Sequence, residues 1–265
     1  MDLCTVISQK YIPQALNLIK SYNFYSDKEK VFVYYFNTAP ESLKIFNQLF
    51  GNQVVLRQVE EICPHALDPL TFVYKAYAIN DCLLNHSRSM IYSDSANCFI
   101  KTTEPLQEDL VDNSLLMSYP HHGLTNEYWT TKKCFEKLES PAAEIMPQYW
   151  AGFQVYQRTP DNILLVTELL NYLKDPDVAL PNMKEKRPDG AAAKCIEHRC
   201  DQSVLSLLIH KHNRHQLYDP EKTLKYGDWQ TIVEFDRTYR PDFSKRVLAP
   251  RESKFGQFRF LNARV

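Results

Sequence analysis

The sequence predicts an α/β fold with a mostly parallel central sheet flanked by helices. Through the first half of the chain, short apolar runs alternate with segments of helical spacing. Such alternation implies right-handed crossovers and parallel strand pairing. Residues 90–100 are apolar, then small and polar around Asp94, then apolar again. This run is typical of a buried strand that ends by presenting an acid and is followed by a second short strand.

The first half is predicted to hold four main strands and three helices. Residues 31–36 are nearly all apolar, as expected of a parallel strand buried on both faces. Ile12, Leu16 and Ile19 show helical spacing, and Pro40 suits the first position of a helix. The predicted strands are 3–8, 31–36, 53–59 and 89–92, and the predicted helices are 9–23, 41–50 and 71–85.

The second half shows a less regular pattern of strands and helices but continues the same domain. Residues 176–190 are rich in Pro, Lys, Asp and Asn and are predicted to form a mobile loop. The last 45 residues or so carry many Arg and Lys, and their aromatic residues have no clear period, which predicts an irregular segment. The remaining predictions are strands 114–119 and 149–157 and helices 130–138, 159–172 and 201–210.

Composition limits the possible functions. A net charge of −1 over 265 residues gives no global field for nucleic acid or anionic membrane, and 44% apolar content is ample for a core. No window approaches the ~18 apolar residues of a membrane span, and the first residues lack a signal peptide's pattern. Seven cysteines, an odd number, fit reduced thiols. We therefore expect a cytoplasmic protein.

Four landmarks stand in a distinctive order: Lys75 within a helix, Asp94 at a strand end, Ala151-Gly152 at a strand, and Asp201-Gln202 at a helix start. Over residues 3–210, this order resembles the nucleotide-sugar-dependent glycosyltransferases of the GT-A fold. In that family the strand-end acid belongs to the DxD motif, which holds a divalent metal and the sugar nucleotide. No single motif is specific, so the order and spacing carry the resemblance.

The resemblance implies transfer of a sugar from a UDP- or GDP-sugar to a hydroxyl acceptor, expected to be a glycan. We expect one GT-A-like domain with a nucleotide-binding half over 1–112 and an acceptor-side half over 113–220, followed by a basic tail over 221–265 to which the resemblance does not extend. Together with the residue types, the resemblance gives these candidates: for catalysis, Asp94 and Asp201; for the donor, Lys75, Asp94, Ser95, Gly152, Arg199 and Gln202; and for the acceptor, Trp129, Trp150 and the paired His121 and His122.

Six of these residues also have an ordinary structural explanation. Asp94 can cap a turn through its side chain, and Asp201 can serve as a helix N-cap. Lys75 can be a solvated lysine on a helix surface. Gly152 can merely relieve packing, and the paired histidines can belong to a surface loop.

The sequence departs from the family at Ala96, where the second acid of DxD is expected. Mg²⁺ and Mn²⁺ need several oxygen ligands, so Asp94 alone predicts a metal that is weakly bound or dispensable. A remote histidine, His121, His122 or His198, is the alternative source of a ligand. Cationic side chains are the other means of stabilising a leaving diphosphate; the candidates are Lys75, Arg199, Arg237, Arg240, Arg246 and Arg251.

Two other functions compete with glycosyl transfer. Ala96 is compatible with a non-catalytic GT-A-like protein that binds a glycan or another protein. A nucleotidyltransferase is disfavoured because residues 8–13 lack a glycine-rich, basic phosphate loop.

Overall fold

The computed structural model describes residues 1–26, 29–99, 102–117, 125–180, 195 and 197–214, together with the backbone of three C-terminal strands. At its centre is a six-stranded sheet of order β3-β2-β1-β4-β7-β6. The strands of this sheet are β1 (Asp2–Ile7), β2 (Val31–Tyr35), β3 (Val54–Gln58), β4 (Ser89–Ser93), β6 (Leu115–Met117) and β7 (Phe153–Gln157). The pairs β1–β2, β2–β3 and β1–β4 are parallel, and β7 runs antiparallel to β4 and β6. The predicted fold class is confirmed.

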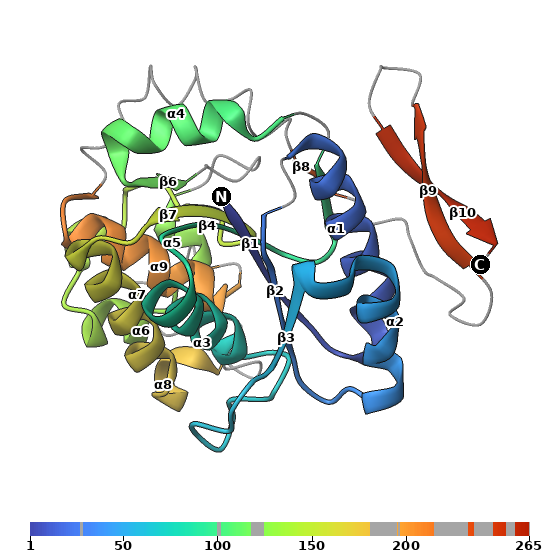
Figure 1. Ribbon diagram of the computed structural model, residues 1–265. Coiled ribbons are helices and arrows are strands. Elements are labelled where there is room, and N and C mark those ends of the chain that lie inside the picture. Colours follow the sequence, from blue (N-terminus) through green and yellow to red (C-terminus); the bar gives the residue numbers. More distant parts are fainter. Residues whose placement is uncertain are drawn as a thin grey trace.

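Helices cover both faces of the sheet (Figure 1). Proline lies in the first turn of several of them, where a missing N–H costs no hydrogen bond. The helices are α1 (Ile12–Tyr25), α2 (Pro40–Phe50), α3 (Val73–Asp81), α4 (Glu104–Asn113), α5 (Asn126–Trp129), α6 (Lys132–Lys137), α7 (Pro160–Leu173), α8 (Pro176–Ala179) and α9 (Cys200–Lys211).

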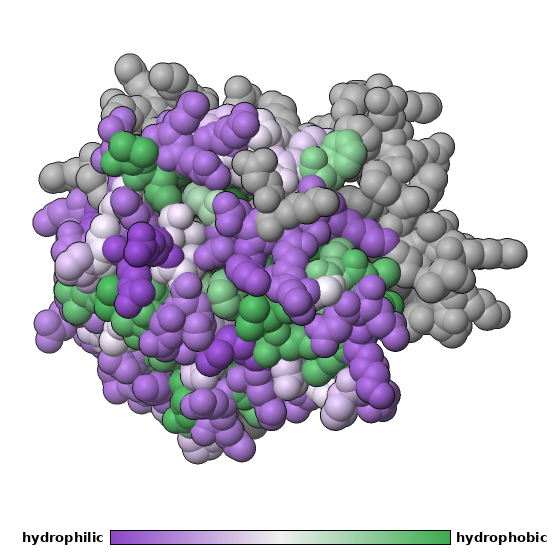
Figure 2. All heavy atoms as spheres, in the orientation of Figure 1, coloured by the Kyte–Doolittle hydropathy of each residue, from purple (hydrophilic) through white to green (hydrophobic). Residues whose placement is uncertain are grey.

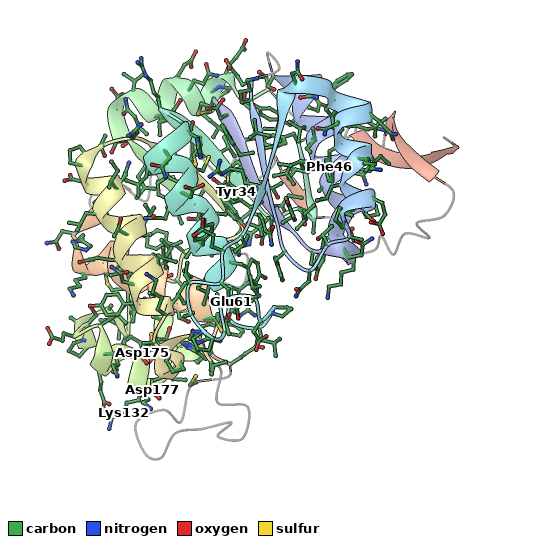
Figure 3. All side chains as sticks on the ribbon, turned by 60° about the horizontal axis from the view of Figure 1, so that its bottom comes forward. Tyr34, Phe46, Glu61, Lys132, Asp175 and Asp177 are labelled. Atoms are coloured by element: carbon green, nitrogen blue, oxygen red, sulfur yellow. The ribbon has the colours of Figure 1, made fainter. Side chains whose placement is uncertain are left out.

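Alternation along the strands divides the core into two layers. Leu3 and Ile7 of β1 belong to a cluster formed with α1, α2 and α4, whereas Cys4 and Val6 belong to a cluster formed with α3, α7 and α9. Phe46 of α2 and Tyr34 of β2 mark these two layers in Figure 3. Because both layers are apolar, the sheet is fixed between them and its carboxyl edge is left for polar side chains.

Several predicted boundaries differ from the observed ones. Residues 149–152 precede β7 instead of belonging to it. The predicted helix 71–85 is divided into α3 and a π-helical turn, Cys82–His86. Helices α4 and α5 were not predicted, and α8 occupies the start of the segment interpreted as a loop.

The C-terminal strands were also missed. β5 (Asn97–Phe99), the predicted short strand after Asp94, pairs antiparallel with β8 (Val233–Phe235). β9 (Arg246–Glu252) and β10 (Phe258–Arg264) form an antiparallel hairpin, which lies beyond α1 in Figure 1. The prediction of an irregular segment is therefore wrong for these strands.

One face of the molecule carries mainly polar residues (Figure 2). Figure 2 shows hydrophilic residues over much of one face, with smaller hydrophobic areas between them. At one edge of Figure 3, Asp175 and Asp177 lie near Lys132; these aspartates pair with Lys137 and Lys133. Within the described residues, no helix has the length and apolar character needed to cross a membrane.

Candidate active site

Asp94 follows β4 directly, at the carboxyl edge of the sheet. Its backbone N–H donates to the carbonyl oxygen of Gly152 at 2.9 Å, and the hydroxyl of Tyr92 donates to its Oδ1 at 2.9 Å. The side chain of Asp94 keeps 31% of its surface exposed. The carboxylate is thus fixed at one oxygen and still accessible, in the position where α/β sheets bind ligands. Its neighbour Ser95 lies in the turn that follows and is buried.

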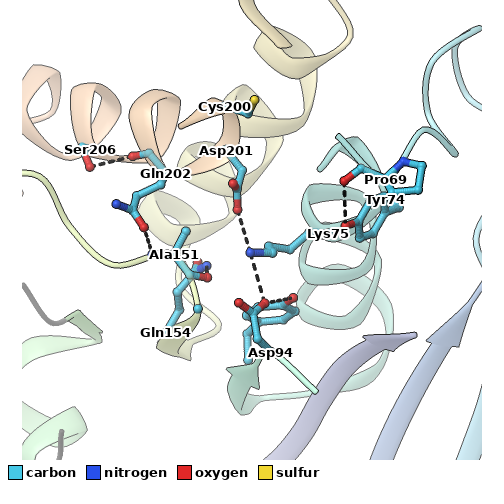
Figure 4. A network of polar contacts seen from close by, with 12 residues as sticks. Pro69, Tyr74, Lys75, Asp94, Ala151, Gln154, Cys200, Asp201, Gln202 and Ser206 are labelled. Atoms are coloured by element: carbon cyan, nitrogen blue, oxygen red, sulfur yellow. Dashed lines mark hydrogen bonds and ion pairs between the residues drawn. The ribbon is translucent and has the colours of Figure 1, made fainter. Parts of the chain in front are cut away.

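Lys75 projects from the first turn of α3 and is buried, with 7% of its side chain exposed. Its Nζ lies 3.1 Å from Oδ1 of Asp94 and 2.8 Å from Oδ2 of Asp201 (Figure 4). The rings of Phe72 and Tyr92 flank the ammonium at 5.1 and 5.7 Å. The interpretation of Lys75 as a solvated surface lysine is therefore wrong.

Asp201 lies in the first turn of α9, with 7% of its side chain exposed. The N-cap of α9 is Arg199, so the interpretation of Asp201 as the N-cap is wrong. Burial raises the pKa of Asp201, and the charge of Lys75 opposes that rise. Conversely, burial lowers the pKa of Lys75, but the carboxylates of Asp201 and Asp94 outweigh it and raise that pKa above its usual value.

Lys75 therefore lies between two carboxylates that favour its charged form. One positive charge against two negative ones leaves the cluster of Lys75, Asp94 and Asp201 with a net negative charge when both acids are ionised. The exposed part of Asp94 presents that charge to the solvent, whereas Asp201 is shielded.

Gly152 allows the chain to approach Asp94 closely. A Cβ at this position would lie 2.8 Å from Oδ2 of Asp94 and 2.6 Å from Nε1 of Trp150. The carbonyl oxygen of Gly152 also accepts a bond from Nδ2 of Asn97 at 2.9 Å. Gly152 and the indole of Trp150 thus belong to the immediate surroundings of Asp94.

The other predicted site residues lie along α9 and α5. Gln202 is buried, and its Oε1 accepts a bond from the backbone N–H of Ala151 at 3.4 Å. The guanidinium of Arg199 stacks on the ring of Trp129, 4.0 Å from its centroid, and Trp129 itself is buried. Trp129 is therefore covered by Arg199, whereas Trp150 lies next to Asp94.

Some predicted residues lie outside the described part of the chain. These are His121 and His122, Arg237 and Arg240, and the side chains of Arg246 and Arg251.

Sequence reasoning missed several residues that hold this site. Tyr92 was detectable, because residues two apart in a strand share a face and it stands two before Asp94. Gln148 carries no such signal, because its partners lie 54 and 55 positions away in the sequence.

The described side chains offer a divalent metal few ligands. No group of three His, Cys, Asp or Glu side chains gathers among the described residues. Oδ1 of Asp94 is engaged by Lys75 and Tyr92, which leaves Oδ2. Both ring nitrogens of His198 are engaged, by the N–H of Thr131 and the carbonyl of Val178. The described side chains at this site therefore form no protein cage for a divalent metal.

The fold is that of the GT-A-like glycosyltransferases. The galactosyltransferase LgtC, solved with donor and acceptor sugar analogues, aligns with a TM-score of 0.50 and 18% identity, over 78% of this chain and 70% of LgtC. At that identity the likeness establishes the fold alone.

Two further solved structures were also found. Mouse xyloside xylosyltransferase 1 aligns over 91% of this chain and 99% of its own, at 13% identity and a TM-score of 0.46. GlyE of Streptococcus pneumoniae aligns over 92% of this chain and 56% of its own, at 12% identity and a TM-score of 0.47. Neither a protein-family model nor a curated protein matches the sequence.

Proposed function

We propose that this protein is a glycosyltransferase that moves a sugar from a UDP- or GDP-sugar to a hydroxyl group of a glycan acceptor. The observation that carries the proposal is the cluster of Lys75, Asp94 and Asp201 at the carboxyl edge of a GT-A-like sheet. These three residues come from α3, the turn after β4 and α9, so only the fold brings them together. Such convergence of buried charges is typical of a functional site.

In this proposal Asp94 contacts the donor, directly or through a divalent metal that its Oδ2 would help to hold. Lys75 offsets part of the negative charge of Asp94 beside the leaving diphosphate, and Asp201 holds Lys75 in place. Preorganised charges act strongly in a buried site because they need no reorganisation during the reaction. Mn²⁺ or Mg²⁺, where bound, would add charge at the diphosphate beside Oδ2 of Asp94.

The nucleotide is proposed to lie over the carboxyl ends of β1 and β2. Tyr11 follows β1 and is 38% exposed, and the ammonium of Lys10 lies 4.8 Å from the centroid of its ring. An exposed aromatic ring can stack on a nucleobase, and a nearby cation can pair with a phosphate. Ser95, Gly152, Gln202 and Arg199 are proposed to complete the donor side.

The acceptor is proposed to enter from the side of Trp129, Trp150, His121 and His122. If the reaction inverts, Asp201 is the candidate base. Its ion pair with Lys75 must then be rearranged, because that pairing stabilises the charged carboxylate and weakens it as a base.

A thermal-shift screen of UDP-, GDP- and CDP-sugars, with and without Mn²⁺, tests the proposal, together with an assay of donor hydrolysis. Stabilisation by a nucleotide-sugar accompanied by hydrolysis is the expected result. The second candidate, a non-catalytic glycan- or protein-binding protein, is favoured by Ala96. Absence of nucleotide binding at millimolar concentration would support that candidate.

A further inference from the structure

A continuous chain of buried hydrogen bonds runs from α5 to the turn that contains Gly152. Oγ of Ser203 donates to the carbonyl of Trp129 at 2.6 Å. Nε2 of Gln148 donates to Oγ of Ser203 at 3.4 Å, and Nε2 of Gln202 donates to Oε1 of Gln148 at 2.6 Å. The chain ends where Ala151 donates to Gln202. Gln148 and Ser203 have no exposed surface, and Gln202 is buried.

The two ends of this chain fix its direction. The carbonyl of Trp129 can only accept, so the hydroxyl of Ser203 donates to it and accepts from Gln148. The amide of Gln148 must then turn its oxygen toward Gln202. At the far end, the N–H of Ala151 can only donate, so the oxygen of Gln202 faces it. Each amide therefore has a single orientation that satisfies all its partners.

The turn receives a second fixed contact from the other side. Nε2 of Gln154 donates to the carbonyl of Ala151 at 2.7 Å, and Oε1 of Gln154 accepts from the hydroxyl of Tyr156. Figure 4 shows Ala151 held between Gln202 and Gln154, close to Asp94. Ala151 lies between Trp150 and Gly152 in the sequence. A Cβ at Gly152 would lie within 3 Å of both the indole of Trp150 and Oδ2 of Asp94, so both residues lie close to that carboxylate. The orientation of Gln202 and the position of this turn are thus coupled.

We propose that Gln148 is a positioning residue, which orients the carboxamide of Gln202 and thereby holds residues 150–152 against Asp94. The expected effect of Gln148 on catalysis rests on the proposed function, whereas its effect on the orientation of Gln202 does not. With Gln148 replaced by an apolar side chain of similar length, Nε2 of Gln202 loses its acceptor. The amide is then free to turn, and the restraint on Ala151 weakens.

The test uses the full chain labelled with ¹⁵N-glutamine, with the Gln202 side-chain signals assigned from Gln202→Leu. In Gln148→Met we expect the side-chain protons of Gln202 to exchange with solvent about fivefold faster, the factor expected for loss of one hydrogen bond. Gln148→Glu, measured at a pH where its buried carboxyl is protonated, keeps an acceptor facing Gln202 and a donor facing Ser203, and should preserve the protection. Asn80→Leu is the matched control, because it removes an amide–hydroxyl bond to Thr167 elsewhere, between α3 and α7.

The same variants are compared in turnover of whichever nucleotide-sugar the wild type hydrolyses. We expect kcat of Gln148→Met to fall about ten- to a hundredfold with little change in KM, because small misplacements near a reacting centre are costly. Unchanged exchange at Gln202 would overturn the orienting role, and an unchanged kcat in an active enzyme would overturn the catalytic consequence. A wild type that turns over no donor would overturn the proposed function, while the exchange measurement would still decide the role of Gln148.

Discussion

The carbonyl oxygen of Gly152 accepts a hydrogen bond from the backbone of Asp94 at 2.9 Å, while the space beside its Cα is filled by the carboxylate of that same residue. The φ of Gly152 is not in the left-handed region, so glycine is needed here for the close approach and not for an unusual backbone conformation. The turn and the acid therefore act as one structural unit.

Gly152→Ala should destabilise the protein and displace Asp94. The added Cβ would lie under 3 Å from the indole of Trp150 and from Oδ2 of Asp94, and overpacking of this kind costs about 1–3 kcal/mol. Urea unfolding and donor affinity measure the two effects. Gly51→Ala is the control, because Gly51 has φ 55° with open space around it, so it should lose stability without losing donor affinity. Equal donor affinity in wild type and Gly152→Ala would contradict this account.

Asp94→Asn should abolish most of the transfer while preserving the fold. The amide can still accept from Tyr92, and Lys75 keeps its pair with Asp201. The contact with the donor loses its charge, and loss of one preorganised electrostatic contact typically costs ~10²–10³ in rate. The rate of donor hydrolysis and the melting temperature check the two parts. Unchanged turnover would reduce Asp94 to a structural residue.

Lys75→Met should be strongly destabilising, because Asp201 would be left buried without its cation. Removing one partner of a buried ion pair typically costs about 3–5 kcal/mol. Burial already raises the pKa of Asp201, and loss of Lys75 would raise it further. An acid whose folded-state pKa is raised favours folding below its unfolded pKa and loses that stability as pH rises through the folded value. Urea unfolding should therefore show a smaller deficit near pH 4 than at pH 7.

The double variant Lys75→Met/Asp201→Asn is the control for this interpretation. It removes the uncompensated charge, so it should recover part of the lost stability at pH 7 and lose the pH dependence of the deficit. Equal stability of Lys75→Met and wild type at pH 7 would contradict the buried ion pair.

Metal should be held weakly, and activity should persist in part when EDTA is present. Oδ2 of Asp94 is the available carboxylate oxygen beside the half-buried Ala96, so the diphosphate and water must supply the remaining ligands. Ala96→Asp should then tighten Mn²⁺ binding, measured by calorimetry in the presence of the nucleotide diphosphate. Complete loss of activity in EDTA would show that other ligands complete the site, and His121→Ala or His122→Ala should then reproduce that loss.

His198 should make the fold sensitive to acid. Burial lowers the pKa of His198, whose Nδ1 accepts from Thr131 and whose Nε2 therefore donates to Val178. The folded protein accommodates the neutral form of His198. Its contribution to the free energy of unfolding is therefore complete above the unfolded pKa of about 6.5 and is lost as pH falls below that value. The loss is at most about 1.4 kcal/mol per pH unit. In His198→Gln the free energy of unfolding should depend less steeply on pH between about pH 5 and 6.5, the range in which an ordinary histidine titrates. An unaltered slope would assign the acid sensitivity to other groups.

The local sequence pattern was sufficient to predict that Asp94 follows a strand, but it could not predict that Lys75 is buried. A strand that ends in an acid is a feature of neighbouring residues, and so is the start of α9 before Asp201. The burial of Lys75 is decided by two carboxylates 19 and 126 positions away in the chain, which no helical period reveals. The strand β8 was missed for the same reason, because its partner β5 is distant in sequence. The Gln148 chain depends on contacts among a loop, α5 and α9, whose joint geometry exists only after folding.

The pairing of β5 with β8 has a consequence for shortened versions of the protein. β5 begins three residues after Asp94, and β8 occupies one of its hydrogen-bonding edges. A polypeptide terminated after α9 would expose that edge as a row of unsatisfied N–H and C=O groups, ready to recruit another molecule. Self-association of such a truncated form would arise close to Asp94, so its oligomeric state must be measured before its activity is compared with that of the full chain.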